Sequence, residues 1–245
     1  MTDELRAEAE QHIAEHALGE AARIQRLSRI REVVLGAQDG LLVPLGVVTG
    51  MAAANPSRSL IVVAGLAEAV AGAIAMGSGS YLASDSEERL YRAEIQSERE
   101  ELESEPAREI EELALILERE GLPADRARVV ADGLASDPNV FLRTKVEKEL
   151  GLSPDAGGAA VGDALVVGGT YAVAAAVPLW PYLLLARTPA LVVSLICTLL
   201  ALFALGMVKG RVARQGLLVA GLQVAAVGSV SAAVGFAIGR LVSGV

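Results

Sequence analysis

The sequence predicts an all-α integral membrane protein with five transmembrane helices and an acidic helical cytoplasmic insert between helices 2 and 3. Three observations predict this fold class. Hydrophobic residues make up 53% of the 245 positions, and the mean hydropathy of +0.46 leaves too little polar surface to cover a soluble core. Five apolar runs reach the length, about 18 residues or more, that crosses a bilayer. The acidic residues gather in a single segment, whereas the rest of the chain is nearly neutral.

The insert differs from its surroundings in charge. Residues 85–155 contain 20 Asp or Glu and 10 Lys or Arg, a net charge of −10, whereas the rest of the chain has 10 acidic and 11 basic residues. The overall net charge of −9 disfavours nucleic-acid binding, which depends on basic residues. The predicted organisation is an N-terminal cytoplasmic amphipathic helix, transmembrane helices 1–2, the insert, and transmembrane helices 3–5, over residues 1–30, 31–84, 85–160 and 161–245.

The predicted spans follow from the apolar runs. These runs cover approximately residues 33–54, 60–83, 162–184, 189–208 and 216–243. The polar segment NPSRS at residues 55–59 separates the first two runs and predicts a tight turn, and so a helical hairpin. Glycines recur four residues apart, Gly36 with Gly40 and Gly46 with Gly50. This spacing predicts helices that approach one another closely in lipid.

Basic residues flank the spans unequally, and this inequality predicts the orientation. Seven lie on one side of the membrane and three on the other. The seven are Arg23, Arg26, Arg29, Arg31, Lys209, Arg211 and Arg214, and the three are Arg58, Arg187 and Arg240. Because short cytoplasmic loops are enriched in Lys and Arg, we expect the N-terminus and the insert in the cytoplasm. With five spans, the C-terminus is expected outside.

Four helices are expected in the insert. Their approximate ranges are 85–104, 107–120, 124–135 and 138–151. The first continues the second span and is stopped by Pro106, because the residue before a proline avoids helical geometry. Asp137 is a good N-cap and Pro138 a good first helical residue for the fourth helix, which is expected to end at Gly151.

Two carboxylates lie inside predicted spans, Asp39 in the first and Glu68 in the second. Glu32, at the cytoplasmic mouth, precedes Asp39 by seven residues on the same helical face, and Met76 follows Glu68 by eight. A charge at the bilayer centre costs about 2.5–3.5 kcal/mol on insertion scales, so such residues usually face a cavity or a partner. One interpretation is a cation or proton path with Met76 as a soft ligand for a transition metal. The other is a set of structural, hydrogen-bonded carboxyl groups and a methionine that only packs.

Glutamates recur three residues apart on the two helices that flank Pro106. The pairs are Glu98 with Glu101 and Glu109 with Glu112. Each pair shares one helical face, and a chain reversal at Pro106 would allow the four carboxylates to converge, with Glu149 as a candidate fifth ligand. Carboxylate oxygens bind hard divalent ions and also accept Fe²⁺ or Mn²⁺. A solvated acidic face is the alternative.

The remaining candidate residues are few. His12 and His16 lie four residues apart on the predicted N-terminal helix, a spacing that suits either a metal or an exposed helix face. Cys197 is the only cysteine, which excludes an intrachain disulfide and a thiolate zinc cluster. Residues 1–30 lack the apolar core of a signal peptide. The sequence has no phosphate-binding loop, HExxH motif or nucleophile–histidine set, so we expect neither an enzyme nor a tightly bound cofactor.

Several segments together carry a family resemblance. They are EVVLGAQDGL at residues 32–41, GLAEAVAGAIAMG at 65–77, SYLAS at 80–84 and ELGL at 149–152. With the acidic helices between them, these segments make the chain resemble the vacuolar iron transporter family, which includes yeast and plant vacuolar proteins and bacterial relatives. The resemblance covers nearly everything from about residue 30 to the end. Arg far outnumbers Lys in this Ala-rich chain, which favours a bacterial member in the bacterial inner membrane.

The resemblance implies a five-helix homodimer that moves cytosolic Fe²⁺ or a similar ion outward in exchange for protons along a path at the subunit interface. It implies path residues Glu32, Asp39, Glu68 and Met76, and cytoplasmic metal ligands Glu98, Glu101, Glu109, Glu112 and Glu149. One position departs from the family: where several eukaryotic members have a methionine four residues before the last glutamate, this chain has Lys145. A cation there removes a soft ligand and is spaced to pair with Glu149, which makes Mn²⁺ a candidate beside Fe²⁺.

Two other function classes stay open. A non-transporting membrane metal sensor or scaffold that uses only the insert predicts metal binding without flux and no need for Asp39. A proton-coupled carrier of an organic solute predicts no dependence on the insert glutamates. The intramembrane carboxylates argue against the sensor, and the glutamate pairs argue against the organic carrier.

Overall fold

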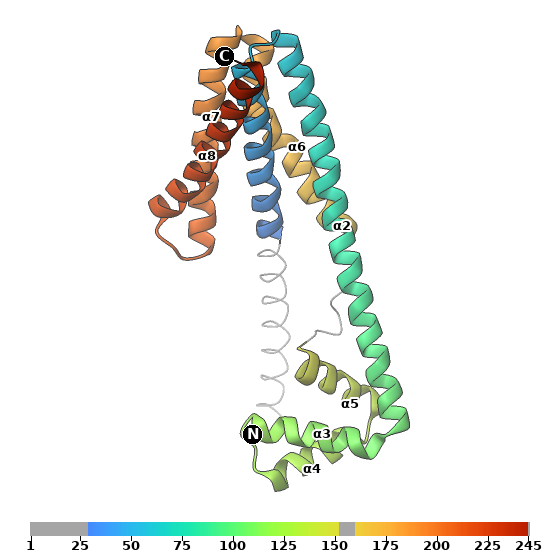
Figure 1. Ribbon diagram of the computed structural model, residues 1–245. Helices are drawn as coiled ribbons and strands as arrows, with labels where there is room; N and C mark the ends of the chain where they lie inside the picture. Colours follow the sequence, from blue (N-terminus) through green and yellow to red (C-terminus); the bar gives the residue numbers. More distant parts are fainter. Residues whose placement is uncertain (1–28, 152–159, 245) are drawn as a thin grey trace, which may run out of the picture. The chain divides into compact units, whose positions relative to one another are not determined.

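The computed structural model describes residues 29–151 and 160–244, and every regular element in these two ranges is helical (Figure 1). The predicted all-α class is therefore confirmed. The expected helix of residues 1–30 falls outside the described residues except at its last two positions, and so do His12 and His16. The described chain forms two compact units. The membrane unit comprises residues 29–81 and 161–244, and the insert unit comprises the described residues between Leu82 and Ala160.

Within the described residues, five helices are long and apolar enough to cross a membrane, as the sequence predicts. They are α1 (Arg29–Ala53), α2 (Arg58–Ser104), α6 (Ala160–Leu184), α7 (Arg187–Val212) and α8 (Leu217–Ser243). Between α1 and α2 the chain turns through Asn55, whose φ of 65° lies in the left-handed region that asparagine tolerates. Helix α2 is continuous over 47 residues and therefore belongs to both units.

The outer faces of the membrane unit are apolar. Large hydrophobic side chains are exposed along its helices, for example Val173 on α6 at 75% and Leu241 on α8 at 80%. A water-soluble protein rarely exposes large apolar patches, whereas lipid tails solvate such side chains as well as a protein core does. This exposure agrees with a protein surrounded by a bilayer.

Small residues bring the helices of the membrane unit together. A Cβ atom at Gly40 of α1 would meet the backbone of Tyr171 on α6, and one at Gly50 would lie 2.9 Å from the carbonyl oxygen of Gly235 on α8. The predicted role of the α1 glycines in close helix approach is confirmed. Interhelical hydrogen bonds add to this packing, since the hydroxyl of Ser231 on α8 donates to the carbonyl oxygen of Leu42 at 3.0 Å.

The insert unit contains the end of α2 and three further α-helices. These are α3 (Pro106–Arg119), α4 (Ala124–Leu134) and α5 (Pro138–Lys145). Its core is a cluster of apolar side chains from α3, α4 and α5 that includes Leu113, Ala127 and the fully buried Phe141. Because this core is made by the unit's own helices, it holds the acidic side chains of α2 and α3 in defined positions.

Proline, aspartate and glycine set the helix ends in the insert unit as predicted. Helix α2 ends at Ser104, and Pro106 is the first residue of α3. The carboxylate of Asp137 accepts hydrogen bonds from the backbone N–H groups of Asn139 and Val140. The fourth predicted helix differs in its second half, where a π-helical segment, η1 (Val146–Leu150), follows α5 directly and ends at Gly151 with φ 64°.

Candidate functional site

A hydrogen bond joins two polar residues of the membrane unit, Tyr171 and Glu68. Tyr171 on α6 is 2% exposed, and its hydroxyl donates to Oε1 of Glu68 on α2. The phenol is a necessary partner, because a polar group surrounded by lipid and apolar side chains must be satisfied within the protein. Glu68 is thus held in position by a second helix.

Glycines on two helices make room for Tyr171. A Cβ atom at Gly72 of α2 would overlap the phenol, and one at Gly40 of α1 would overlap the tyrosine backbone. Asp39 precedes Gly40 on α1. Tyr171 therefore packs against the segments of α1 and α2 that carry the two intramembrane carboxylates.

The other two predicted path residues have different surroundings. Met76 packs against the apolar cluster that contains Tyr171 and Ala69, so its thioether lies on the same side of α2 as this core. Glu32 on α1 is buried, at 9% exposed. Tyr171 itself is a site residue that the sequence reasoning missed, and its signal was a tyrosine in the middle of an apolar span, where its hydroxyl needs a partner.

The insert unit brings four of the five predicted ligands to one point, and that point is occupied by an ammonium group. We call this arrangement the lysine cluster. Nζ of Lys145 lies 3.2 Å from Glu98, 3.0 Å from Glu112 and 3.4 Å from Glu149, and it also pairs with Glu109. The predicted pairing of Lys145 with Glu149 across one turn is present, and the structure adds three partners.

Four helical segments build the lysine cluster. Glu98 comes from the end of α2, Glu109 and Glu112 from α3, and Glu149 from η1, while Lys145 is the last residue of α5. The reversal at Pro106 folds α3 back on α2, as predicted. Glu101, the fifth predicted ligand, lies elsewhere, because its carboxylate faces Arg108 at 4.0 Å and accepts a hydrogen bond from Ser97.

Burial makes the electrostatics of the lysine cluster strong. Lys145 is 2% exposed and Glu109 is fully buried, and charged side chains are almost never this buried unless paired. Burial raises the pKa of Glu98, and the neighbouring Lys145 ammonium opposes that rise. Within the described part of the chain, Oε1 of Glu109 is buried and has no hydrogen-bond partner. The cluster therefore holds more acceptor capacity than the lysine uses.

Four of the five predicted metal ligands are arranged around a cation of the protein itself. Among residues 29–151 and 160–244, no group of three or more His, Cys, Asp or Glu side chains has an arrangement that could hold a metal ion. The oxygens of the lysine cluster face Lys145 instead.

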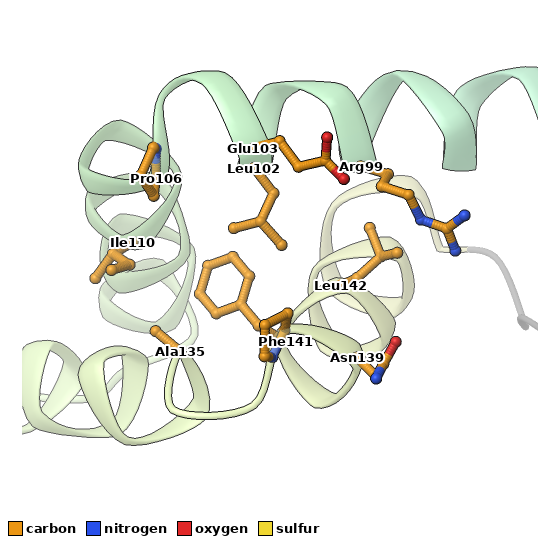
Figure 2. A pocket seen from close by; sticks show the side chains of 10 residues that line it. Arg99, Leu102, Glu103, Pro106, Ile110, Ala135, Asn139, Phe141 and Leu142 are labelled. Atoms are coloured by element: carbon orange, nitrogen blue, oxygen red, sulfur yellow. The ribbon is translucent and has the colours of Figure 1, made fainter.

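A separate pocket of about 320 Å³ lies in the insert unit (Figure 2). Figure 2 shows the Phe141 ring near its centre, beside Leu102 and Ile110, with Arg99 and Asn139 at its edge. None of the five predicted metal ligands lines it. This pocket is an opening over the apolar core of the unit and not part of the carboxylate cluster.

These features define a multi-pass membrane protein with a polar site between its helices and a folded, charged domain outside them. The model of the VIT family matches residues 30–240. Vacuolar iron transporter 2 of Oryza sativa subsp. japonica is 35% identical over 217 residues, and vacuolar iron transporter 1 of Tulipa gesneriana is 36% identical over 217 residues, with 88% of each chain covered in both cases. Protein CCC1 of Saccharomyces cerevisiae is 29% identical over 74% of this chain and 57% of its own length.

The chain therefore belongs to the VIT family. The predicted family resemblance is confirmed, and so is the expectation that the protein is not an enzyme. The match includes the spans that carry Asp39 and Glu68 and the whole of the insert unit, since these lie between residues 30 and 240.

Proposed function

We propose that the protein exports Fe²⁺, Mn²⁺ or both from the cytoplasm in exchange for protons. Family membership supports metal transport, because two of the relatives named above, those of Oryza sativa and Tulipa gesneriana, are called vacuolar iron transporters. The observation that carries the proposal is the hydrogen bond between Tyr171 and Glu68, with the backbone of Tyr171 packed against Gly40, the neighbour of Asp39 on α1. Carboxylates inside membrane spans usually mark a functional site such as an ion path.

The exchange follows from the chemistry of carboxylates. A carboxyl group must release its proton before its oxygens bind a metal ion. Asp39 and Glu68 therefore take up either protons or metal, and alternate exposure of the site to the two sides of the membrane converts this competition into exchange. Met76 adds a thioether, a ligand that favours transition metals over Mg²⁺ or Ca²⁺.

The insert has the role of metal capture in this proposal. Its glutamates bind cytoplasmic metal and raise the local concentration at the mouth near Glu32. The excess of Lys and Arg on the short N-terminal and 209–214 flanks supports an orientation with the insert in the cytoplasm. We further propose a homodimer in a bacterial inner membrane, with the ion path at the subunit interface.

Flux measurements in proteoliposomes test this function. Fe²⁺ and Mn²⁺ entry and luminal pH are recorded together, with an acidic lumen. We expect metal entry with luminal alkalinisation, and loss of both in Asp39→Ala. Ser229→Ala is the control, since this exposed α8 hydroxyl only bonds to its own helix at Ala225. Normal flux in the Asp39→Ala variant would show that the path is wrong.

A second candidate, a membrane metal sensor, is favoured by one observation: the insert unit has its own apolar core and its own charged cluster. Such a sensor binds metal through the insert and needs no path. Metal binding without flux in the same proteoliposomes would support the sensor and contradict transport.

A further inference from the structure

We propose that Lys145 is a tethered cation that competes with divalent metal for the lysine cluster, so that metal binds there only when the ammonium group leaves. This inference rests on the proposed role of the insert in metal capture and adds to it a residue that sets the affinity. It concerns Lys145, whose ammonium group lies among four of the five predicted metal ligands.

The charges of the cluster support a cation exchange. Four carboxylates surround one ammonium group, so the cluster keeps a net negative charge with Lys145 in place. A second cation is attracted by this charge, and Glu109 offers a buried oxygen, Oε1, that no other described residue hydrogen-bonds. The lysine therefore neutralises the cluster only in part.

Geometry prevents both cations from occupying the cluster together. A divalent metal needs several oxygens at about 2.0–2.6 Å, and the ammonium already approaches Oε2 of all four glutamates. A metal that took the same oxygens would lie within a few ångströms of a positive charge in a buried site, where repulsion is strong. Metal binding and lysine insertion are therefore mutually exclusive.

The exposure of the carboxylates gives a direction for the exchange. The side chains of Glu112 and Glu149 are 34% and 37% exposed, whereas Glu98 and Glu109 form the buried end. A metal first meets Glu112 and Glu149, and the flexible lysine chain leaves by the same open side. Glu112 also pairs with Arg108, so it keeps a cationic partner after the ammonium group of Lys145 has left.

Lysine labelling in the wild-type protein tests the exchange directly. The chain has three lysines, Lys145, Lys148 and Lys209, so an amine-reactive reagent and mass spectrometry can follow each one. Without metal we expect slow labelling of Lys145 and fast labelling of Lys148, which is 39% exposed. Saturating Mn²⁺ is expected to raise Lys145 labelling several-fold and to leave Lys148 unchanged. Unchanged Lys145 labelling at saturating Mn²⁺ overturns the proposal.

Substitution tests the same point by affinity. Lys145→Met removes the competing cation, and we expect Mn²⁺ to bind the full-length protein at least about tenfold more tightly, which corresponds to about 1.4 kcal/mol. Lys148→Met is the matched control, because it removes the same charge from an exposed lysine that pairs with Glu120. Equal Mn²⁺ affinity in Lys145→Met and wild type, with both proteins folded, contradicts the proposal.

The outcomes separate this proposal from the transport function. If Mn²⁺ exposes Lys145 but proteoliposomes show no flux, the proposed function fails and the competition stands. If flux is normal while Mn²⁺ neither exposes Lys145 nor binds Lys145→Met more tightly, the competition fails and transport stands.

Discussion

The hydroxyl of Tyr171 on α6 donates a hydrogen bond to Oε1 of Glu68 on α2, although the two residues lie 103 positions apart in the sequence. The bond joins two predicted spans at the level of the intramembrane carboxylates. It also determines which carboxylate oxygen remains available, because Oε1 of Glu68 is already an acceptor. A metal ion or proton that binds Glu68 must therefore either use the other carboxylate oxygen or displace the Tyr171 hydroxyl.

Removal of this hydroxyl is expected to impair transport. Tyr171→Phe keeps the ring that fills the space beside Gly72 but removes the hydroxyl that donates to Glu68. A hydrogen bond contributes about 0.5–3 kcal/mol, depending on the charge of its acceptor, so we expect the initial rate of metal uptake to fall by about tenfold. Metal flux into proteoliposomes measures the effect.

Tyr182→Phe is the matched control on the same helix. Tyr182 is fully buried, but within the described residues its hydroxyl has no hydrogen-bond partner. We expect unchanged flux, and equal or greater stability, because the variant removes an unsatisfied polar group. Equal loss of flux in both variants would assign the effect of Tyr171→Phe to general packing.

Gly40→Ala is expected to destabilise the membrane unit. The added methyl group would overlap the backbone of Tyr171 and lie 3.0 Å from the Cβ atom of Ala174. Overpacking of this kind costs about 1–3 kcal/mol, so the thermal midpoint in detergent should fall. Gly169→Ala is the control, since a Cβ atom at Gly169 has open space around it. A midpoint for Gly40→Ala equal to that of the control would contradict the close contact of α1 with α6.

Phe141→Ala is expected to unfold the insert unit in part. The ring is fully buried in the core with Leu113 and Ala131, and deletion of a buried phenylalanine costs about 3–5 kcal/mol. Hydrogen exchange of the full-length protein should show faster exchange in α3, α4 and α5. Val129→Ala on α4, a residue that is 71% exposed, should leave exchange unchanged within the small range typical of surface changes.

Asp137→Ala is expected to loosen the start of α5. The carboxylate accepts from the N–H groups of Asn139 at 2.9 Å and Val140 at 3.4 Å, and loss of such a cap costs about 0.5–2 kcal/mol. Amide exchange at the first turn of α5 should accelerate. Asp137→Asn retains an acceptor oxygen, so amide exchange at the first turn of α5 should stay as slow as in the wild type. Faster exchange in Asp137→Asn would show that the negative charge of Asp137 matters more than its hydrogen bonds.

Most of the fold could be predicted because its signals are local. Each span is a run of apolar residues, and the insert helices are bounded by residues such as Pro106, Asp137 and Gly151, whose effect on the backbone acts within a few positions. The π-helical turn after Lys145 had no local signal. A cluster that takes one residue from η1 and others from α2 and α3 depends on contacts between segments far apart in the chain.

The sequence predicts which residues belong to the candidate sites, but it does not predict most of the contacts between their side chains. Asp39 and Glu68 stand out by themselves, because a carboxylate inside a membrane span is costly. The i, i+4 spacing indicated the contact between Lys145 and Glu149. The three other partners of Lys145, and the attachment of Glu68 to Tyr171, have no sequence spacing that indicates them.

The sequence by itself determined the class of this protein: the number of spans, the acidic insert, and the carboxylates placed in an apolar environment. These properties depend on composition and on hydropathy over one helix at a time. The tertiary structure decided which charges neutralise one another. Burial makes an unpaired charge or polar group expensive, and the partners come from other helices: Tyr171 for Glu68, and Lys145 for Glu109.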